Sequence, residues 1–395
     1  MDCSVSKKLL KLFGDFGVET IRQPLFDYGK LYSSPSEYEV AFPSDCNQVQ
    51  LIVALARKHK ILLRVRASGH TFNGVTLPRK GELLVRTDQL DHFHFDTAGT
   101  ITVGSGALVW DVRDLVRDHG FDLPVYNGGW AGPTVGGYIN AGGFGKSGLS
   151  EVYGGLWENV EQITLIDGKA NIRTINRTDK IFPWMFGSYG QLGFLIEVKL
   201  NIIPKDEESC PTYPLGLSGH IPQRQDTDPK LNDSPPENGN QPNLFWFSLL
   251  VSPEDQFWAW VELYKFVKSN ALKPDGGWSG PILDDQHIGY HYVIPFINFH
   301  PPLVYPKPET FLVIGVMCVL STGDVASNQS VLQIEKNFID LAVKNQYKLY
   351  LQAENIGRNV DFPAYYGEEI YNSFRQLKDQ FDPDRLLNQD VIFSK

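Results

Sequence analysis

The amino-acid sequence predicts an α+β protein of at least two domains. Helical hydrophobic spacing alternates with short strand-like segments from residue 42 to residue 205, and a second group of strands and helices follows residue 243. A polar, proline-rich segment at 222–243 separates the two groups. The length of 395 residues agrees with two to three domains of roughly 150 residues each.

The first elements follow from the spacing of apolar residues. Residues 4–16 place apolar side chains on one helical face, which predicts a short helix. A longer helix is predicted to begin at Ser44 as its N-cap. The apolar face of that helix consists of Val49, Ile52, Val53 and Ala56. The next predicted elements are strands at 61–65, 82–86 and 100–103 and a helix at 108–118.

The later elements repeat this alternation. Residues 160–166 and 193–203 are predicted strands, because they are rich in β-branched and other apolar residues. Beyond the polar segment, residues 310–320 form a continuous apolar run that is typical of a buried strand. A helix at 328–345 and a strand at 347–352 are predicted after it. These elements predict a second domain in this part of the chain.

Charge and cysteine content exclude several classes of function. The 36 basic and 46 acidic residues give a net charge of −10, which is unfavourable for binding nucleic acid. The four cysteines form no C-x-x-C pair, so a zinc ribbon or disulfide scaffold is not expected. No apolar run approaches the 18 or so residues of a membrane span, and no signal-peptide core precedes a cleavage site. The sequence therefore predicts a protein of the cytoplasm without a membrane span.

Two common motifs occur in contexts that do not suit them. Residues 143–148 match G-x-G-x-x-G, and Gly145-Lys146-Ser147 resembles the end of a phosphate loop. Both motifs need a buried strand before them and a helix after them, and the glycine-broken surroundings predict neither. His92 and His94 share one face of a predicted strand, and the pair at 287/291 lacks the glutamate of H-E-x-x-H, so both pairs are interpreted as surface or core histidines.

The segment RASGHTFNG, at 66–74, follows a predicted strand and carries the first candidate chemistry. Backbone N–H groups of Ala67, Ser68 and Gly69 could converge on an anion, because their side chains are small. His70 comes directly after them. At this point it could be a general base, a hydrogen-bonding group, a covalent tether or a histidine in a tight turn.

The glycine distribution adds a second observation. Of the 36 glycines, 11 lie between Gly128 and Gly155. Glycine permits close backbone approach and positive φ, whereas strand interiors disfavour it. The tract is therefore interpreted as an ordered ribbon against a flat or phosphorylated ligand, with a series of tight turns as the alternative.

Four blocks of the sequence resemble, in order, FAD-linked oxidases of the vanillyl-alcohol oxidase (PCMH) type. The blocks are RASGHTFNG; PTVGGYINAGGFG at 133–145 with ENVEQITLIDG at 158–168; IFPWMFGSYGQLGFLIEVKL at 181–200; and YLQ at 350–352 with FDPDRLLNQDVIF at 381–393. They frame nearly the whole chain. The arrangement looks most like that of cytokinin dehydrogenases, and berberine-bridge-like oxidases and sugar or alditol oxidases share most of it.

The resemblance implies a fold and a domain plan. A PCMH-type FAD-binding domain is expected at 38–205, after an N-terminal helical extension at 1–37. A substrate domain of antiparallel sheet plus helices is expected at 206–350, and a C-terminal return to the FAD domain at 351–395.

The resemblance also implies the residues that hold FAD, with His70 bonded to the 8α carbon of the flavin. The residues expected to contact FAD are Arg66, Ala67, Ser68, Gly69, His70, Thr71, Gly129, Pro133, Thr134, Val135, Gly137, Asn140, Gly143, Leu195, Tyr350 and Asn388.

Two positions depart from the patterns of the related branches. Gly132 stands where berberine bridge enzymes carry a cysteine that forms a second flavin tether, so one covalent link is expected. Gly129 stands where cytokinin dehydrogenases carry an aspartate base, so the base must come from elsewhere.

The implied function is an FAD-dependent oxidoreductase that takes a hydride from a CH–OH or CH–NH group of a small organic substrate. Alternation along the 347–352 strand predicts that Tyr350, Gln352 and Glu354 share one face, with Glu354 as the first candidate base. Tyr365 and Tyr366 are further candidates. The expected electron acceptor is O2 or another oxidant. Cytokinin-dehydrogenase-like amine oxidation, sugar or alditol oxidation and a non-catalytic flavin-binding module are the alternatives.

Overall fold

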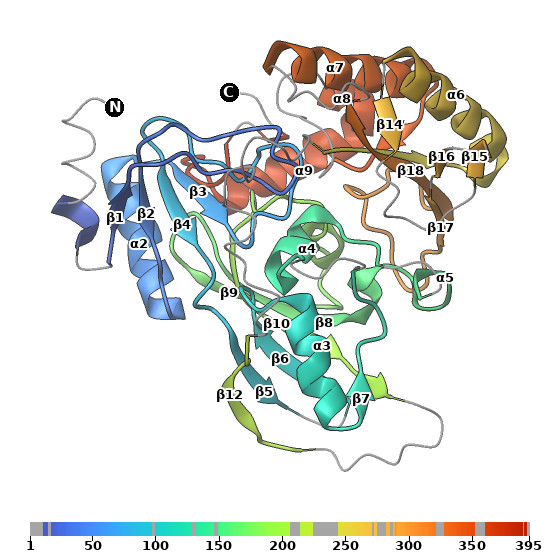
Figure 1. Cartoon of the computed structure of the whole chain (residues 1–395). Helices are drawn as coiled ribbons and strands as arrows, with labels where there is room; N and C mark the ends of the chain where they lie inside the picture. Colours follow the sequence, from blue (N-terminus) through green and yellow to red (C-terminus); the bar gives the residue numbers. More distant parts are fainter. Residues whose placement is uncertain are drawn as a thin grey trace.

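A computed structural model describes most of the chain. The described residues are 11–14, 17–96, 99–127, 132–145, 149–205, 214–223, 244–270, 272–274, 282–284, 287–288, 290–320, 328–351, 360–389 and 391–392. Helices and antiparallel sheets occupy largely separate regions, which confirms the α+β class (Figure 1). None of the helices in these ranges is both long and apolar enough to cross a membrane.

A four-stranded sheet lies nearest the N-terminus. Its strands, in spatial order, are β1 (Glu19–Ile21), β2 (Tyr38–Ala41), β4 (Leu83–Arg86) and β3 (Leu63–Arg66). β2 and β3 both run parallel to β4. Helix α2 (Cys46–His59) connects β2 to β3 and buries the four predicted apolar residues. Its N-cap is Asp45 rather than the predicted Ser44, because the Asp45 carboxylate accepts a hydrogen bond from Gln48 N at 2.9 Å.

A six-stranded antiparallel sheet follows. Its spatial order is β12 (Ser218–His220), β5 (His92–Phe95), β6 (Thr100–Gly104), β10 (Phe194–Asn201), β8 (Val160–Ile166) and β9 (Ile172–Asn176). α3 (Val109–Asp118) and α4 (Val135–Ala141) lie near it in Figure 1. A short pair of β7 (Phe121–Asp122) and β11 (Ile203–Pro204) extends the region. β12 joins this sheet although it lies beyond the domain boundary predicted at 205/206.

A five-stranded antiparallel sheet forms the other half. β14 (Leu272–Pro274), β18 (Phe311–Leu320), β13 (Phe245–Val251) and β19 (Lys348–Leu349) lie in that order, and β17 (Tyr290–Ile294) also pairs with β18. Helices α6 (Gln256–Ser269) and α7 (Asn328–Lys344) pack beside it (Figure 1). Aromatic rings fill the space between sheet and helices: Phe247 lies 5.0 Å from Phe266 and 4.8 Å from Phe338, between ring centroids.

The remaining elements complete the chain. They are α5 (Ser150–Tyr153), the pair β15 (Ile282–Asp284) and β16 (His287–Ile288), α8 (Phe362–Tyr366), α9 (Glu368–Phe381) and three 3₁₀ turns at Leu156–Asn159, Phe182–Met185 and Pro253–Asp255. After α9 the chain returns to the four-stranded sheet, where Leu387 pairs with Leu63 of β3 in parallel. One hydrophobic cluster includes residues of both halves, such as Leu165 and Phe247.

Several predicted elements differ from the structure or are only partly described by it. The glycine tract contains a real helix, α4, which the glycine content argued against. The predicted strand at 347–352 is reduced to β19, because only Leu349 and Lys348 pair with β13. The predicted helix at 4–16 is described only over residues 11–14, where positions 11–13 are helical. The expected helical extension at 1–37 also contains β1.

Candidate functional site

A cavity opens between β3, α4, the start of β10 and the C-terminal return. The predicted residues that line it are Ala67, Ser68, Gly69, His70, Thr71, Pro133, Thr134, Gly137, Asn140, Leu195 and Asn388. They come from four separate stretches of sequence. The fold therefore brings most of the predicted set together at one place.

The first wall of the cavity is the loop that follows β3. Gly69 has φ +70°, and a Cβ there would collide with the Arg66 guanidinium. Arg66 itself does not line the cavity; its guanidinium donates to Thr76 Oγ1 at 2.9 Å and to the Phe26 carbonyl. Arg66 was predicted to contact the ligand, and in the structure it instead supports the turn from beneath. Only glycine fits at position 69.

The second wall is helix α4. Thr134 is its N-cap, with Thr134 Oγ1 accepting from Gly137 N at 3.1 Å. Gly136 faces Ser105, where an added Cβ would come within 2.7 Å of the Ser105 Cβ and 2.9 Å of its carbonyl oxygen. The glycines therefore allow the helix to lie directly against neighbouring backbone. Their role is close packing at the cavity, within a helix rather than an extended ribbon.

Two asparagine amides hold the third side in place. Asn140 Oδ1 accepts from Gly190 N at 2.9 Å, and Asn140 Nδ2 donates to the Gly136 carbonyl at 3.0 Å. Asn388 Oδ1 accepts from Val65 N at 2.8 Å, and Asn388 Nδ2 donates to the Tyr189 carbonyl at 2.9 Å. Each side-chain amide is thus bound to backbone on two sides. These residues fix the positions of separate walls relative to one another.

The cavity contains hydroxyl groups that no described residue satisfies. Thr71 Oγ1, Thr87 Oγ1 and Ser105 Oγ are buried and have no hydrogen-bond partner within the described residues. All three residues line the cavity. Unsatisfied buried polar atoms are costly in a folded protein, so they indicate that a polar ligand belongs there. A glycine-lined cradle with free hydroxyls fits a large polar cofactor such as FAD.

His70 lies at the edge of this cavity in a tight turn. Thr71 N donates to the Gly69 carbonyl at 2.8 Å, which makes His70 the central residue of a γ-turn. The imidazole lies against the ring of Tyr28, with centroids 4.2 Å apart and planes tilted by 39°. The backbone and a neighbouring ring therefore both constrain this histidine.

Two buried acids lie behind the His70 loop. Burial raises the pKa of Asp27 to about 7, although the Gly74 N–H and the Arg66 charge oppose the shift. Burial likewise raises the pKa of Glu335 to about 8, against the opposing hydrogen bond from Tyr32. Neither residue lines the cavity. Asp27 and Glu335 can affect the site only through the segments to which they are hydrogen-bonded, at Gly74 and Tyr32.

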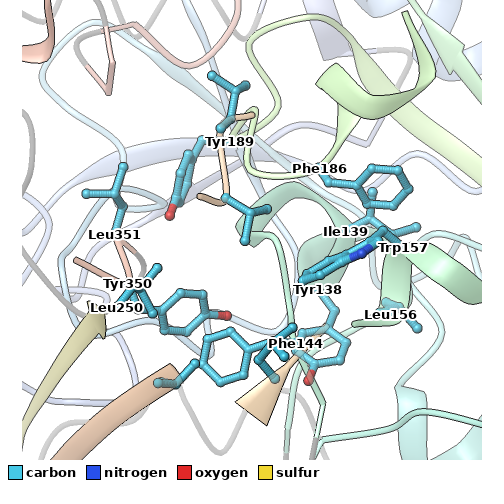
Figure 2. Packing of buried hydrophobic residues seen from close by; sticks show 14 of the residues in the cluster. Tyr138, Ile139, Phe144, Leu156, Trp157, Phe186, Tyr189, Leu250, Tyr350 and Leu351 are labelled. Carbon is cyan, nitrogen blue, oxygen red and sulfur yellow. The ribbon is translucent and has the colours of Figure 1, made fainter. Parts of the chain in front are cut away.

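An aromatic group lies beside the cavity. Tyr350 packs against Phe144, with ring centroids 4.5 Å apart, and against Trp246 at 5.3 Å. Figure 2 shows the phenols of Tyr189 and Tyr350 directed into the same interior space. Burial, together with the nearby phenols, raises the pKa of Tyr189 well above its ordinary value. Tyr189 also has φ +53°, a left-handed conformation that is uncommon for a residue with a side chain.

Some predicted site residues lie elsewhere or outside the described residues. Val135 is buried in the core. At Gly143 a Cβ would collide with the Tyr138 ring, so this glycine serves packing. Neither lines the cavity, and Tyr350 lies beside it rather than in its lining. Gly129, Gln352 and Glu354 lie outside the described residues.

Ten residues that line the cavity were not among the predicted site residues, and Thr87, Ser105 and Tyr189 are three of them. Ser105 stands between Gly104 and Gly106, where added Cβ atoms would collide with the Leu90 and Thr87 carbonyls. This G-S-G triplet was the available signal for close packing. Nothing in the local sequence marks Tyr189 or Thr87.

Comparisons with known proteins identify the kind of domain. A family model described as an FAD binding domain matches residues 39–176. Berberine bridge enzyme-like 25 of Arabidopsis thaliana is 28% identical over 173 residues, covering 41% of this chain and 30% of that protein. D-2-hydroxyglutarate dehydrogenase of Stutzerimonas stutzeri is 25% identical over 189 residues, covering 44% and 40%. Glycolate oxidase subunit GlcD of Bacillus subtilis is 25% identical over 191 residues, covering 46% and 40%.

The matched stretch spans only 30–40% of the length of these relatives. The family model nevertheless covers both the loop that carries His70 and helix α4. Residues 39–176 therefore match an FAD-binding domain, and the relatives support the predicted resemblance to FAD-linked oxidases of the PCMH type.

Proposed function

We propose that the chain is an FAD-dependent oxidoreductase that takes a hydride from a CH–OH or CH–NH group of a small organic substrate. The observation that carries the proposal is the cavity of small residues and buried, unsatisfied hydroxyls within the FAD-binding domain. When bound, FAD supplies the hydride acceptor. The chain's own residues bind it, orient it and exclude water from it.

In this proposal two backbone segments hold the cofactor. The loop of Ala67 to Thr71 and the start of α4 cradle its polar parts, with Thr71 Oγ1, Thr87 Oγ1 and Ser105 Oγ as hydrogen-bonding groups. Leu195 and Asn388 line the side that faces the C-terminal return. Close approach depends on Gly69 and Gly136 remaining without side chains.

His70 is the proposed covalent anchor. An imidazole nitrogen of His70 would hold the 8α carbon of FAD. Formation of that bond would release one proton from each group and two electrons, for which O2 would be the oxidant. One link is proposed, because Gly132 offers no second nucleophile.

The substrate is proposed to occupy the aromatic side of the site. Tyr350 and Gln352 orient it, and Glu354 takes the proton of its hydroxyl or amine group. A positioned base contributes roughly 10²–10⁴-fold to such a reaction. The aromatic contacts of Tyr350 with Phe144 and Trp246 support an enclosed, water-poor site. O2 or another oxidant is the proposed final acceptor, and no nucleic acid partner is proposed.

The substrate class has more than one candidate. Two of the relatives are named for 2-hydroxy acids, D-2-hydroxyglutarate and glycolate, which favours a CH–OH substrate. Sugar or alditol oxidation is a related possibility. Amine oxidation of the cytokinin dehydrogenase kind, and a flavin-binding module without turnover, remain as alternatives.

Flavin content is the primary test. Purified protein is expected to be yellow, and after acid precipitation the yellow colour should stay with the pellet. His70→Ala should move all flavin to the supernatant. Retention of colour in the His70→Ala pellet would contradict the anchor, and a protein that never takes up FAD would contradict the function.

Anaerobic bleaching tests the chemistry. A panel of 2-hydroxy acids, sugars, alditols and amines is mixed with the flavoprotein, and loss of flavin absorbance is followed. Glu354→Gln should slow bleaching roughly 10²–10⁴-fold without changing flavin content. A flavoprotein that no member bleaches would favour the binding module.

A further inference from the structure

The N-terminal strap, residues 25–34, is not part of either FAD-contacting segment, yet it lies against the His70 loop. The strap closes on itself, because Ser34 N donates to the Leu25 carbonyl at 2.8 Å and Leu25 N donates to Ser34 Oγ at 2.9 Å. Phe26 and Ser33 form an antiparallel bridge. The strap is therefore a compact loop of defined shape.

The strap is bonded to the loop on both sides of His70. Tyr28 N donates to the Gly69 carbonyl at 3.1 Å, and Gly29 N donates to the Thr71 carbonyl at 3.3 Å. A third contact joins Gly74 N to Asp27 Oδ2 at 2.8 Å. The residues before and after His70 are thus both held by one segment, from which the Tyr28 side chain projects.

The Tyr28 ring is itself supported. It lies edge-on to Phe72, with ring centroids 5.3 Å apart and planes at 73°. Gly29 passes so close to Phe72 that a Cβ there would come within 2.9 Å of that ring. Tyr28 also contacts the imidazole of His70, with ring centroids 4.2 Å apart. The phenol ring is therefore in contact with both His70 and Phe72.

The strap also reaches the second half of the molecule. Leu244 N donates to the Gly29 carbonyl at 3.0 Å, next to the start of β13. Tyr32 donates to Glu335 of α7. The orientation of the strap is thereby fixed by both halves of the fold.

We propose that Tyr28 is a positioning residue for His70: its ring holds the imidazole in the orientation that faces the FAD cavity. The inference rests on the proposed function in that His70 is taken to contact FAD. Tyr28 acts through His70 and does not line the cavity itself. The contacts that support this role are those of the Tyr28 ring.

Four variants test this assignment. Tyr28→Leu and Tyr28→Met both remove the ring but keep apolar volume. Two such variants are made because the test needs only one of them to fold. Tyr28→Phe restores the ring without the hydroxyl. Phe26→Ala is the matched control, since it removes an aromatic side chain from the same strap while the Phe26 carbonyl can still accept from Arg66.

The first readout needs no cofactor. In flavin-free protein with labelled histidine, the ring resonances of His70 are assigned by their loss in His70→Ala. They should shift in Tyr28→Leu or Tyr28→Met, because the ring current of Tyr28 is gone, and stay near their original positions in Tyr28→Phe and Phe26→Ala. Unchanged resonances in both Leu and Met variants would overturn the contact.

The second readout is FAD uptake by flavin-free protein. Loss of an aromatic contact of this kind changes an equilibrium constant roughly two- to tenfold. FAD dissociation constants at early times, and the half-time for acid-stable flavin, should rise by that factor in the ring-less variants. The same substitutions should have no further effect in a His70→Ala background. An equal effect there would make Tyr28 merely structural.

The outcomes separate the two proposals. Protein that binds FAD without any acid-stable flavin contradicts the covalent anchor, while the resonances and dissociation constants still judge Tyr28. Protein that never binds FAD contradicts the proposed function, and the resonances still judge the contact.

Discussion

Two sides of the site are built from opposite materials. The side formed by the His70 loop and α4 is made of backbone, glycines and short hydroxyl side chains, and an added methyl group at Gly69 or Gly136 meets other atoms at once. The opposite side is made of large rings, with Tyr350 between Phe144 and Trp246. Backbone geometry thus defines one side, and side-chain volume defines the other.

This difference shows which kinds of sequence pattern carry information about function. A run of glycines and small residues has few structural causes, so it indicates a ligand or a close packing contact. Buried aromatic residues occur in every core, and their sequence positions do not distinguish a substrate site from ordinary packing. The cavity that we propose for FAD was therefore predictable in outline, whereas the contacts of Tyr350 with Phe144 and Trp246 were not.

The largest expected effect tests the backbone side. Gly69→Ala should abolish flavin binding and destabilise the protein, because its Cβ collides with Arg66. Gly81→Ala is the control: Gly81 also has positive φ, at +87°, but has open space around it. Gly81→Ala should lower the free energy of unfolding by only about 1 kcal/mol, and the protein should keep its flavin. Flavin-to-protein ratio and urea unfolding measure both, and equal losses in the two variants would refute the steric argument.

The next effect tests the aromatic side. Tyr350→Phe should keep its flavin, since the ring remains, and should lower the rate of anaerobic flavin reduction about tenfold through one lost hydrogen bond to substrate. Tyr366→Phe is the comparison, because the Tyr366 hydroxyl donates to the Leu303 carbonyl. That variant should lose stability instead of rate. Equal rates for Tyr350→Phe and the parent protein would show that the Tyr350 hydroxyl takes no part.

A smaller effect concerns the unsatisfied hydroxyls. Thr71→Val should raise the FAD dissociation constant about fivefold while leaving the flavin-free protein as stable as before, because Thr71 Oγ1 has no partner within the described residues. Thr76→Val should behave in the opposite way, since Thr76 Oγ1 accepts from Arg66. Fluorescence titration with FAD and thermal unfolding separate the two. A loss of stability in flavin-free Thr71→Val protein would show that the Thr71 hydroxyl has a hydrogen-bond partner even without FAD.

The smallest expected effect is a pH dependence at Asp27. Its pKa rises from 3.8 in the unfolded chain to about 7 in the folded protein. Between these values the unfolded state loses the proton first, so stability that is fully present near pH 4 is lost as the pH approaches 7. Asp27→Asn removes this loss and should raise Tm at pH 8 but not at pH 4, by roughly 2–4 °C for each kcal/mol. Identical Tm differences at both pH values would contradict the assignment.

Hydrophobic periodicity gave reliable elements wherever local sequence was sufficient. β8 and β18 and helices α3 and α7 lie within about two residues of their predicted ranges, and α2 buries the four apolar residues predicted for it. Helix α4 was missed, because Gly136 and Gly137 disfavour a helix while the Thr134 cap that stabilises it acts on Gly137 N. Its formation depends on packing against Ser105, which periodicity does not reveal.

The parts of the site that were missed depend on long-range contacts. Tyr28 belongs to the strap and contacts His70 from there. Tyr189 has its left-handed conformation where it is hydrogen-bonded to Asn140 and Asn388. No local pattern connects such residues. The loop at 66–74 was recognisable because its small residues and histidine are contiguous in the chain.

The return of the chain to β3 also affects the timing of assembly. Val65 and Asn388 are joined across 323 residues, and Lys378 Nζ secures this return by donating to the Gln191 and Leu387 carbonyls. At ribosomal rates of roughly 5–20 residues per second, between about 15 and 65 seconds separate synthesis of the two partners. The His70 loop therefore leaves the ribosome long before its last wall exists. A ligand that needs every wall of this cavity can therefore bind only after Asn388 has been synthesised.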